Sequence, residues 1–129
     1  MNALPEWPAG TVAVLATGAG APHAIPVSTA VRKGPRTIAL ALAHGRESLA
    51  RLREDPRCAL AILAADNVAI TAIGRAAVVR EGDRVAVVRI DVEAIQDHGR
   101  DTFVIDGGVQ WRWTDADAER ADAEVREAL

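Results

Sequence analysis

Short runs of apolar residues, separated by turns that contain glycine or proline, follow one another along most of the chain. Runs of this length that are rich in valine, isoleucine and alanine predict β-strands. The expected strands span residues 11–17, 23–31, 37–43, 58–65, 67–79 and 85–95. The first three read as a meander, and Pro26 is expected at a sheet edge or a bend because proline donates no backbone hydrogen bond.

One interruption of this pattern predicts a short internal helix. After His44-Gly45-Arg46, the apolar residues Leu49 and Leu52 lie three apart among charged residues, and Asp55-Pro56 ends the pattern. This spacing is typical of an amphipathic helix that stops at proline. A glycine inside a long strand is typical of a bulge or bend, which we expect at Gly74.

The C-terminal part predicts a hairpin followed by a helix. Residues 102–105 and 109–113 flank the turn Asp106-Gly107-Gly108, which is typical of a hairpin. Thr114 and Asp117 have the spacing of a capping box, and the following helix would carry an apolar stripe of Ala118, Ala121, Val125 and Leu129. The order gives about seven or eight strands, which fits one barrel domain over residues 1–129 better than alternating βαβ units.

The composition predicts one hydrophobic core and argues against nucleic acid and membranes as partners. The chain has 129 residues, of which 50% are hydrophobic and only 3% aromatic, so a single core of small aliphatic side chains is expected. A net charge of -3 offers no broad positive field, which argues against nucleic-acid binding. No stretch has the pattern of a signal peptide or a membrane span, so we expect a cytoplasmic protein that does not enter membranes.

The cysteine, serine and histidine residues of the chain form no known catalytic or metal-binding motif. The single cysteine, Cys58, lies in an apolar run and is expected to be a buried thiol. Ser28 or Ser48 could be paired with a histidine and an acid, but no Gly-x-Ser-x-Gly elbow supports a hydrolase. No metal site is expected either, because metal-motif spacing is absent from the three histidines, His23, His44 and His98.

The order of the expected elements, together with several short motifs, resembles the flavin-binding split barrel of the pyridoxamine 5′-phosphate oxidase family. The motifs are Val12–Thr17, Pro22–Val27, the helix end Leu52–Arg57 and Gly74-Arg75-Ala76. The resemblance extends from about Leu4 to Trp113. It implies a mainly β, Greek-key-like split barrel that works as a homodimer with a small-molecule ligand at the subunit interface.

In that family FMN, or alternatively a deazaflavin, lies in a groove between two subunits. The resemblance implies cofactor contacts at Pro26, Val27, Ser28, Ala43, His44, Gly45, Arg46 and Ser48. A glycine before a helix start also favours phosphate binding on physical grounds, and Arg46 would add a charged donor. Many members carry a lysine or arginine where this chain has Ser48 and Leu49, and Arg46 with Glu47 can alternatively be a solvated first turn.

Near the C-terminus, Trp111 and Trp113 alternate with Arg112, so both indoles are expected on one side of a strand. The resemblance implies a stacking wall for the cofactor at Trp111, and the alternative is packing against the terminal helix or the dimer interface. The function implied is a flavin-dependent oxidoreductase acting on a small organic substrate. The alternative is a noncatalytic carrier or sensor that binds flavin, deazaflavin or haem on the same fold.

Overall fold

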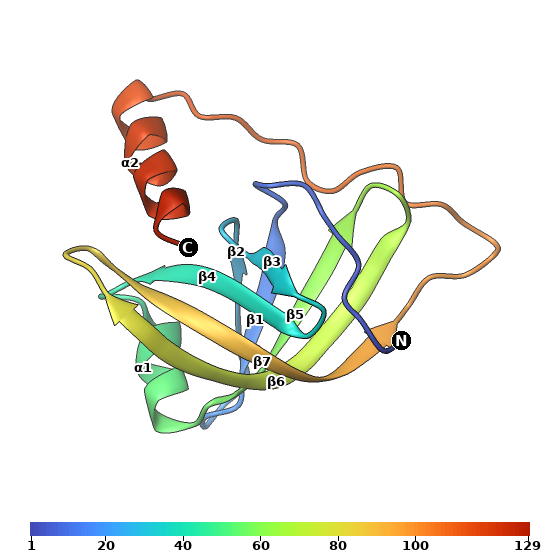
Figure 1. Cartoon of the computed structure of the whole chain (residues 1–129), viewed down its shortest axis with the longest axis horizontal. Coiled ribbons are helices and arrows are strands. Elements are labelled where there is room, and N and C mark those ends of the chain that lie inside the picture. Colours follow the sequence, from blue (N-terminus) through green and yellow to red (C-terminus); the bar gives the residue numbers. More distant parts are fainter.

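A computed structural model describes all 129 residues and shows one antiparallel seven-stranded sheet, curved into an open barrel, with two helices (Figure 1). The strands are β1 (Ala13–Thr17), β2 (His23–Val27), β3 (Val31–Gly34), β4 (Thr37–Ala43), β5 (Arg57–Ala64), β6 (Val68–Glu81) and β7 (Val85–Asp97), and the helices are α1 (Glu47–Glu54) and α2 (Ala116–Glu127). Their order across the sheet is β2-β1-β5-β6-β7-β4-β3. The predicted mainly β class, with one internal and one C-terminal helix, is confirmed.

Aliphatic side chains on the concave face of the sheet form the core. The largest fully buried ones are Leu15, Ile38, Leu40, Leu60, Ile62, Val88 and Ile90, and α1 adds Leu49 and Leu52. Each such burial is worth about 1.5–3 kcal/mol. Along β7 the residues Val88, Ile90 and Val92 are buried whereas Arg89, Asp91 and Glu93 are exposed, so the predicted alternation is confirmed.

The predicted bulge at Gly74 is confirmed. The pairing of β6 with β7 shifts register between Ile73 and Gly74. A Cβ at Gly74 would lie 2.1 Å from the carbonyl oxygen of Asp91, so no larger residue fits there without backbone movement. A second register shift lies between Val78 and Arg80. These two irregularities bend the longest hairpin around the core.

The predicted meander is wrong. The expected strand 23–31 is two strands, and β2 and β3 lie at opposite edges of the sheet. The chain leaves β2 at Ser28, and the Thr29 hydroxyl then accepts a 3.0 Å hydrogen bond from the backbone N–H of Ala41 in β4. At this point a side-chain hydroxyl, rather than the backbone of a neighbouring strand, bonds to the backbone of β4. Pro26 does sit on an edge strand, as predicted.

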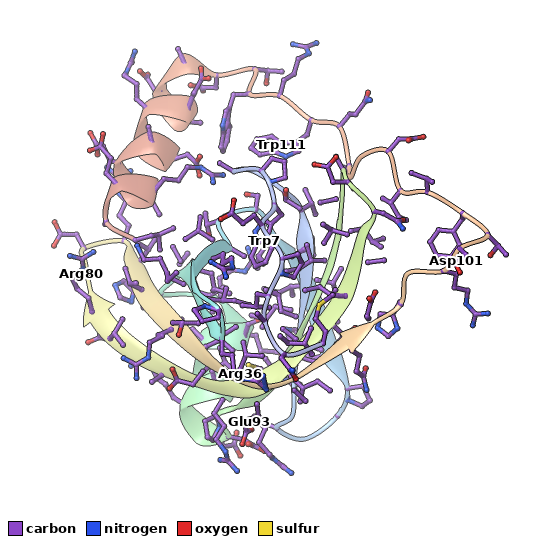
Figure 2. The ribbon with its side chains drawn as sticks, turned by 45° about the vertical axis from the view of Figure 1, so that its right-hand side comes forward. Trp7, Arg36, Arg80, Glu93, Asp101 and Trp111 are labelled. Atoms are coloured by element: carbon purple, nitrogen blue, oxygen red, sulfur yellow. The ribbon has the colours of Figure 1, made fainter.

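The predicted hairpin over residues 102–113 is also wrong, because residues 98–114 form neither strand nor helix. Their backbone is held by separate contacts instead of a ladder. Ile105 exchanges two hydrogen bonds with Asn67, and the Trp111 indole donates a 2.8 Å hydrogen bond to the Gly10 carbonyl. This segment, called the crossing segment below, passes over the barrel to α2 (Figures 1 and 2).

The N-terminal segment is fastened to the barrel by side chains that reach backbone carbonyls. Arg36 donates to the carbonyls of Asn2 and Glu93, at 3.0 and 2.6 Å. The Trp7 indole donates to the Ala30 carbonyl at 2.9 Å. Trp7, Arg36 and Glu93 are labelled in Figure 2. These bonds link the chain start to the residue before β3 and to the β3–β4 turn, where Arg36 is also bonded to β7.

Helix α2 lies on the barrel without a buried residue. Its cap is Asp115 rather than the predicted Thr114, since the Asp115 carboxylate accepts from the N–H groups of Asp117 and Ala118. The predicted apolar stripe, formed by Ala118, Ala121, Val125 and Leu129, is half-buried. Arg126 donates a 2.8 Å hydrogen bond to the Ser28 carbonyl. Neither helix is long and apolar enough to cross a membrane.

Candidate functional site

The start of α1 places four of the predicted site residues in one turn. Ala43 ends β4, and its carbonyl accepts a 3.0 Å hydrogen bond from the N–H of Arg46. His44 is drawn toward the β6–β7 turn, where its Nε2 lies 2.6 Å from the Gly82 carbonyl oxygen. Arg46 occupies the cap position of α1 with an exposed side chain that makes no ion pair. It is therefore a cation available to an anionic group at this helix start.

Ser48, in the first turn of α1, is buried and already bonded. Its Oγ lies 3.1 Å from Nε2 of His23, whose Nδ1 lies 3.0 Å from Oε2 of Glu47. The order hydroxyl, imidazole, carboxylate is that of a hydrolase triad. Ser48 is only 1% exposed, however, so its hydroxyl cannot meet a substrate carbonyl. The cluster instead fastens α1 to β2.

A second group of predicted residues lies at the other end of β2. Pro26 is exposed on the convex face, Val27 is buried in the core, and the Ser28 carbonyl is held by Arg126. Five residues of strand separate this end from the α1 contact, a span of about 16 Å. The structure therefore divides the predicted site residues into two places rather than bringing Ser28 to Ser48.

Trp111 belongs to neither place. Its ring meets that of Trp113 edge to face, with centroids 5.3 Å apart. In the side-chain view Trp111 lies on the far side of the barrel from α1 (Figure 2). Trp113 lines a hollow of about 600 Å³ beneath α2, together with Ala43 and Val125. Trp113 thus faces the terminal helix across this hollow.

The convex side of the sheet carries an apolar surface that the sequence reasoning missed. Residues paired across β2, β1, β5, β6 and β7 share a face. They form two rows, Ala24, Ala16, Ala59, Ile73 and Ala94 in one, and Pro26, Val14, Ala61, Thr71 and Gln96 in the other. We call this surface the alanine face.

The two rows of the alanine face carry no charged side chain. Its side chains are mostly small, Val14 is 44% exposed, and the neighbouring Leu63 is 55% exposed. The face begins beside α1, because Ala24 follows His23, the partner of Ser48. A sequence signal for it exists, since the outward positions of residues 13–17 and 58–64 are apolar where a half-exposed sheet would carry polar residues.

The ionisable groups with shifted pKa values lie beside this face, at the start of β5. The Arg57 guanidinium beside Asp55 lowers the pKa of that carboxyl from 3.8 to about 2. Burial raises the pKa of the Cys58 thiol to about 11, which keeps it neutral. The predicted buried thiol is confirmed. A hollow of about 340 Å³ at this point is lined by Ala16, Thr17, Gly18, Arg57, Cys58 and Ala59.

Comparison with known protein families shows to which family the chain belongs. The sequence profile described as pyridoxamine 5′-phosphate oxidase matches residues 3–118. The chain belongs to the pyridoxamine 5′-phosphate oxidase family. The predicted family and its split-barrel fold are confirmed. No curated protein sequence matches the chain.

Solved structures with the same barrel include a flavin reductase component, the protein HupZ and an FAD-binding protein. BorF, the flavin reductase component of a bacterial two-component tryptophan halogenase, superposes with a TM-score of 0.62 at 13% identity, over 70% of this chain and 81% of its own. HupZ of Group A Streptococcus gives 0.60 at 16% identity, over 76% and 90%. An FAD-binding protein of Mesorhizobium loti gives 0.56 at 13% identity, over 67% and 84%. At these identities the likeness establishes the shared fold.

Proposed function

We propose that this pyridoxamine 5′-phosphate oxidase family member binds a flavin-type cofactor, FMN or a deazaflavin, against its alanine face and acts as an oxidoreductase on a small organic substrate. The observation that carries the proposal is the alanine face itself. A planar, largely apolar ring system needs a surface without bulky or charged groups, and this surface supplies one. Flavin reductase and FAD-binding proteins among the structural relatives support the same reading.

The chain's residues fit the two halves of such a cofactor differently. The small side chains of the alanine face suit the ring. At the α1 start, Arg46 would hold a phosphate together with the backbone N–H groups of the first turn. Arg51 is unavailable for this role, because it bonds Glu47 and the carbonyls of Ala19 and Ala21.

The proposal includes a homodimer. A ring lying on an open sheet face remains in water, whereas a second copy placed on the same face would cover it and bury the exposed Val14, Ile73 and Leu63. Within one chain Ser28 is separated from Ser48 by the length of β2, about 16 Å, so a partner subunit would have to complete the contacts expected beside Ser48. The cofactor supplies the redox chemistry, and the protein binds it, orients it and excludes water.

A noncatalytic carrier or sensor of flavin, deazaflavin or haem is the alternative function. The observation that favours it is the absence of any ionisable side chain from the two rows of the alanine face. A substrate that needs proton transfer from the protein would find only the His98 imidazole beside this surface, with its Nε2 2.8 Å from Oγ1 of Thr71. Reduction of the bound cofactor by NADH or NADPH, followed by turnover with an electron acceptor, separates an oxidoreductase from a carrier.

Titration with FMN, riboflavin and a deazaflavin tests the proposal. Binding should quench tryptophan fluorescence and raise the melting temperature. Val14→Glu, which places a charge on the alanine face, should abolish both effects and yield a monomer in light scattering. Val104→Glu is the matched control, because Val104 is an exposed valine of the crossing segment. Equal behaviour of the two variants would remove the alanine face from the proposal.

A further inference from the structure

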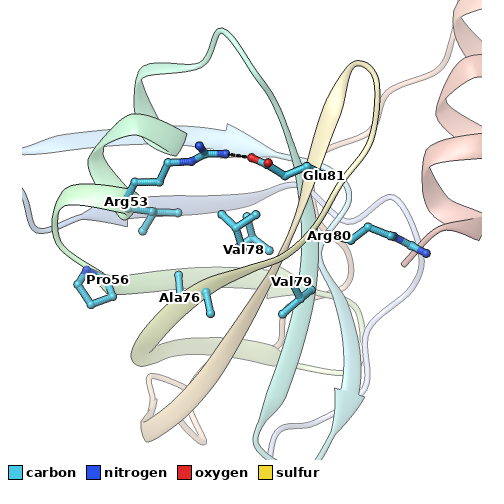
Figure 3. Close-up of a pocket in the computed structure, with 10 residues that line it drawn as sticks. Arg53, Pro56, Ala76, Val78, Val79, Arg80 and Glu81 are labelled. Carbon is cyan, nitrogen blue, oxygen red and sulfur yellow. Dashed lines mark hydrogen bonds and ion pairs between the residues drawn. The ribbon is translucent and has the colours of Figure 1, made fainter.

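A cleft of about 660 Å³ separates α1 from the last part of β6, on residues that the proposed cofactor contacts do not use. Its floor is made of core side chains, Leu52 from α1, Ala76 from β6 and Val88 from β7. Pro56 and Val78 form its walls (Figure 3). A volume of this size, apolar below and open above, is typical of a site for a small molecule.

The shape of β6 creates this cleft. Strand β5 pairs with β6 only as far as Arg75, and the bond from the Ala76 N–H to the Pro56 carbonyl is the last one across that side. The register shift between Val78 and Arg80 then turns the strand locally. Val79 is left 48% exposed at the rim as a result.

The charges at the rim are mainly positive. Arg53 reaches across the opening to an ion pair with Glu81 (Figure 3). Both side chains of that pair are half-exposed, at 50% and 55%, so the pair contributes little to stability and separates at small cost. Arg80 is exposed and makes no ion pair. The Arg80 side chain points away from the opening in Figure 3, so an incoming carboxylate would meet one guanidinium group, that of Arg53, which is held by a replaceable partner.

We propose that this cleft binds a small apolar carboxylate, whose hydrocarbon part lies on Leu52, Val78 and Val88 and whose carboxylate replaces that of Glu81 on Arg53. A bidentate pair between guanidinium and carboxylate gives the strength and orientation that a single exposed ion pair lacks. Binding is noncovalent. The site lies outside the alanine face, so it stands independently of the proposed flavin function.

Hexanoate, hexan-1-ol and hexylamine are suitable probes, because they share the hydrocarbon part and differ in charge. Calorimetric titration of the full chain should give saturable binding of hexanoate, with hexan-1-ol at least about tenfold weaker and hexylamine undetectable. Hexanoate should also shift the methyl NMR signals of Val78 and Val79. Hexylamine binding as tightly as hexanoate, or no saturable hexanoate binding, would overturn the proposal.

Variants of the ion pair should move hexanoate affinity in opposite directions. Arg53→Ala should weaken it about tenfold, because the carboxylate loses its charged partner. Glu81→Gln should strengthen it several-fold, because the competing carboxylate is gone while the shape is kept. Arg89→Ala is the control, since Arg89 pairs with Asp91 on the convex side of β7 and lies outside the cleft. Equal losses for Arg53→Ala and Arg89→Ala, or weaker binding by Glu81→Gln, would overturn the assignment.

Discussion

Nε2 of His23 lies 3.1 Å from the buried hydroxyl of Ser48, and this contact joins an edge strand to the only helix between strands. Since Ser48 is covered, the contact is structural. Ser48→Ala should therefore lower the free energy of unfolding by about 1 kcal/mol, because His23 loses its partner. Chemical denaturation measures this loss, and Ser28→Ala should be nearly neutral because the Ser28 hydroxyl has no hydrogen-bond partner. Esterase activity abolished by Ser48→Ala would contradict the structural role.

Gly74 should tolerate no side chain. Gly74→Ala would drive a Cβ to 2.1 Å from the Asp91 carbonyl oxygen, and relieving that overlap should cost about 3 kcal/mol. Gly107→Ala is the control, because a Cβ there meets no atom within 4 Å. Thermal unfolding of both variants checks the prediction. A Gly74→Ala protein as stable as the control would mean that β6 and β7 are not paired in this register.

The Asp55–Arg57 contact predicts a loss of stability in acid. The folded-state pKa of Asp55 is lowered from 3.8 to about 2. The ionised carboxylate therefore stabilises the fold at pH values above the pKa that Asp55 has in the unfolded chain. That contribution should disappear as the pH falls from about 4 to about 2. Asp55→Asn should be less sensitive than the parent over this range. Identical acid melting curves for the parent and Asp55→Asn would contradict the prediction, and Asp101→Asn serves as the exposed control.

Cys58 should resist modification in the folded protein. Its thiol is buried and its pKa is raised to about 11, so very little thiolate exists near neutral pH. Iodoacetamide should label it slowly under native conditions and fully after denaturation. Mass spectrometry follows the labelling. Rapid labelling of the folded chain would mean that β5 opens locally.

The sequence allowed prediction of the elements but not of all their neighbours. The β5–β6 turn was predictable, and Asp66 and Asn67 both adopt positive φ angles there, as tight hairpins require. The separation of β2 from β3 was not, because apolar alternation gives a strand's buried face and not its partner. The pairing of β4 with β7 joins residues far apart in the chain, which local patterns do not encode.

The C-terminal errors have the same origin. Asp106-Gly107-Gly108 has the composition of a hairpin turn, but beside it the Ile105 backbone is held by Asn67 and the Trp111 indole by the Gly10 carbonyl. For the site, the α1 start was predictable from the glycine and arginine before it. The cluster around His23 was not, because Ser48 reaches that histidine only when β2 and α1 pack together.

Arg46 is expected to be the main side-chain contact of the cofactor phosphate. A charge-assisted hydrogen bond contributes about 1.5–3 kcal/mol, so Arg46→Ala should weaken FMN binding roughly ten- to a hundredfold. The loss should be much smaller for riboflavin, which has no phosphate. Equal losses for both ligands would show that Arg46 acts through the structure, and no loss would leave it as a solvated first turn. Arg32 and Lys33 would then be tested next.

Native mass spectrometry tests the central claim most directly, because it reads assembly and ligand in one spectrum. The account predicts a homodimer whose mass increases by that of FMN or a deazaflavin, either as purified or after addition of the ligand. It also predicts that Val14→Glu yields a monomer without that added mass. A stable monomer that gains no mass with excess FMN, riboflavin or deazaflavin would contradict the account.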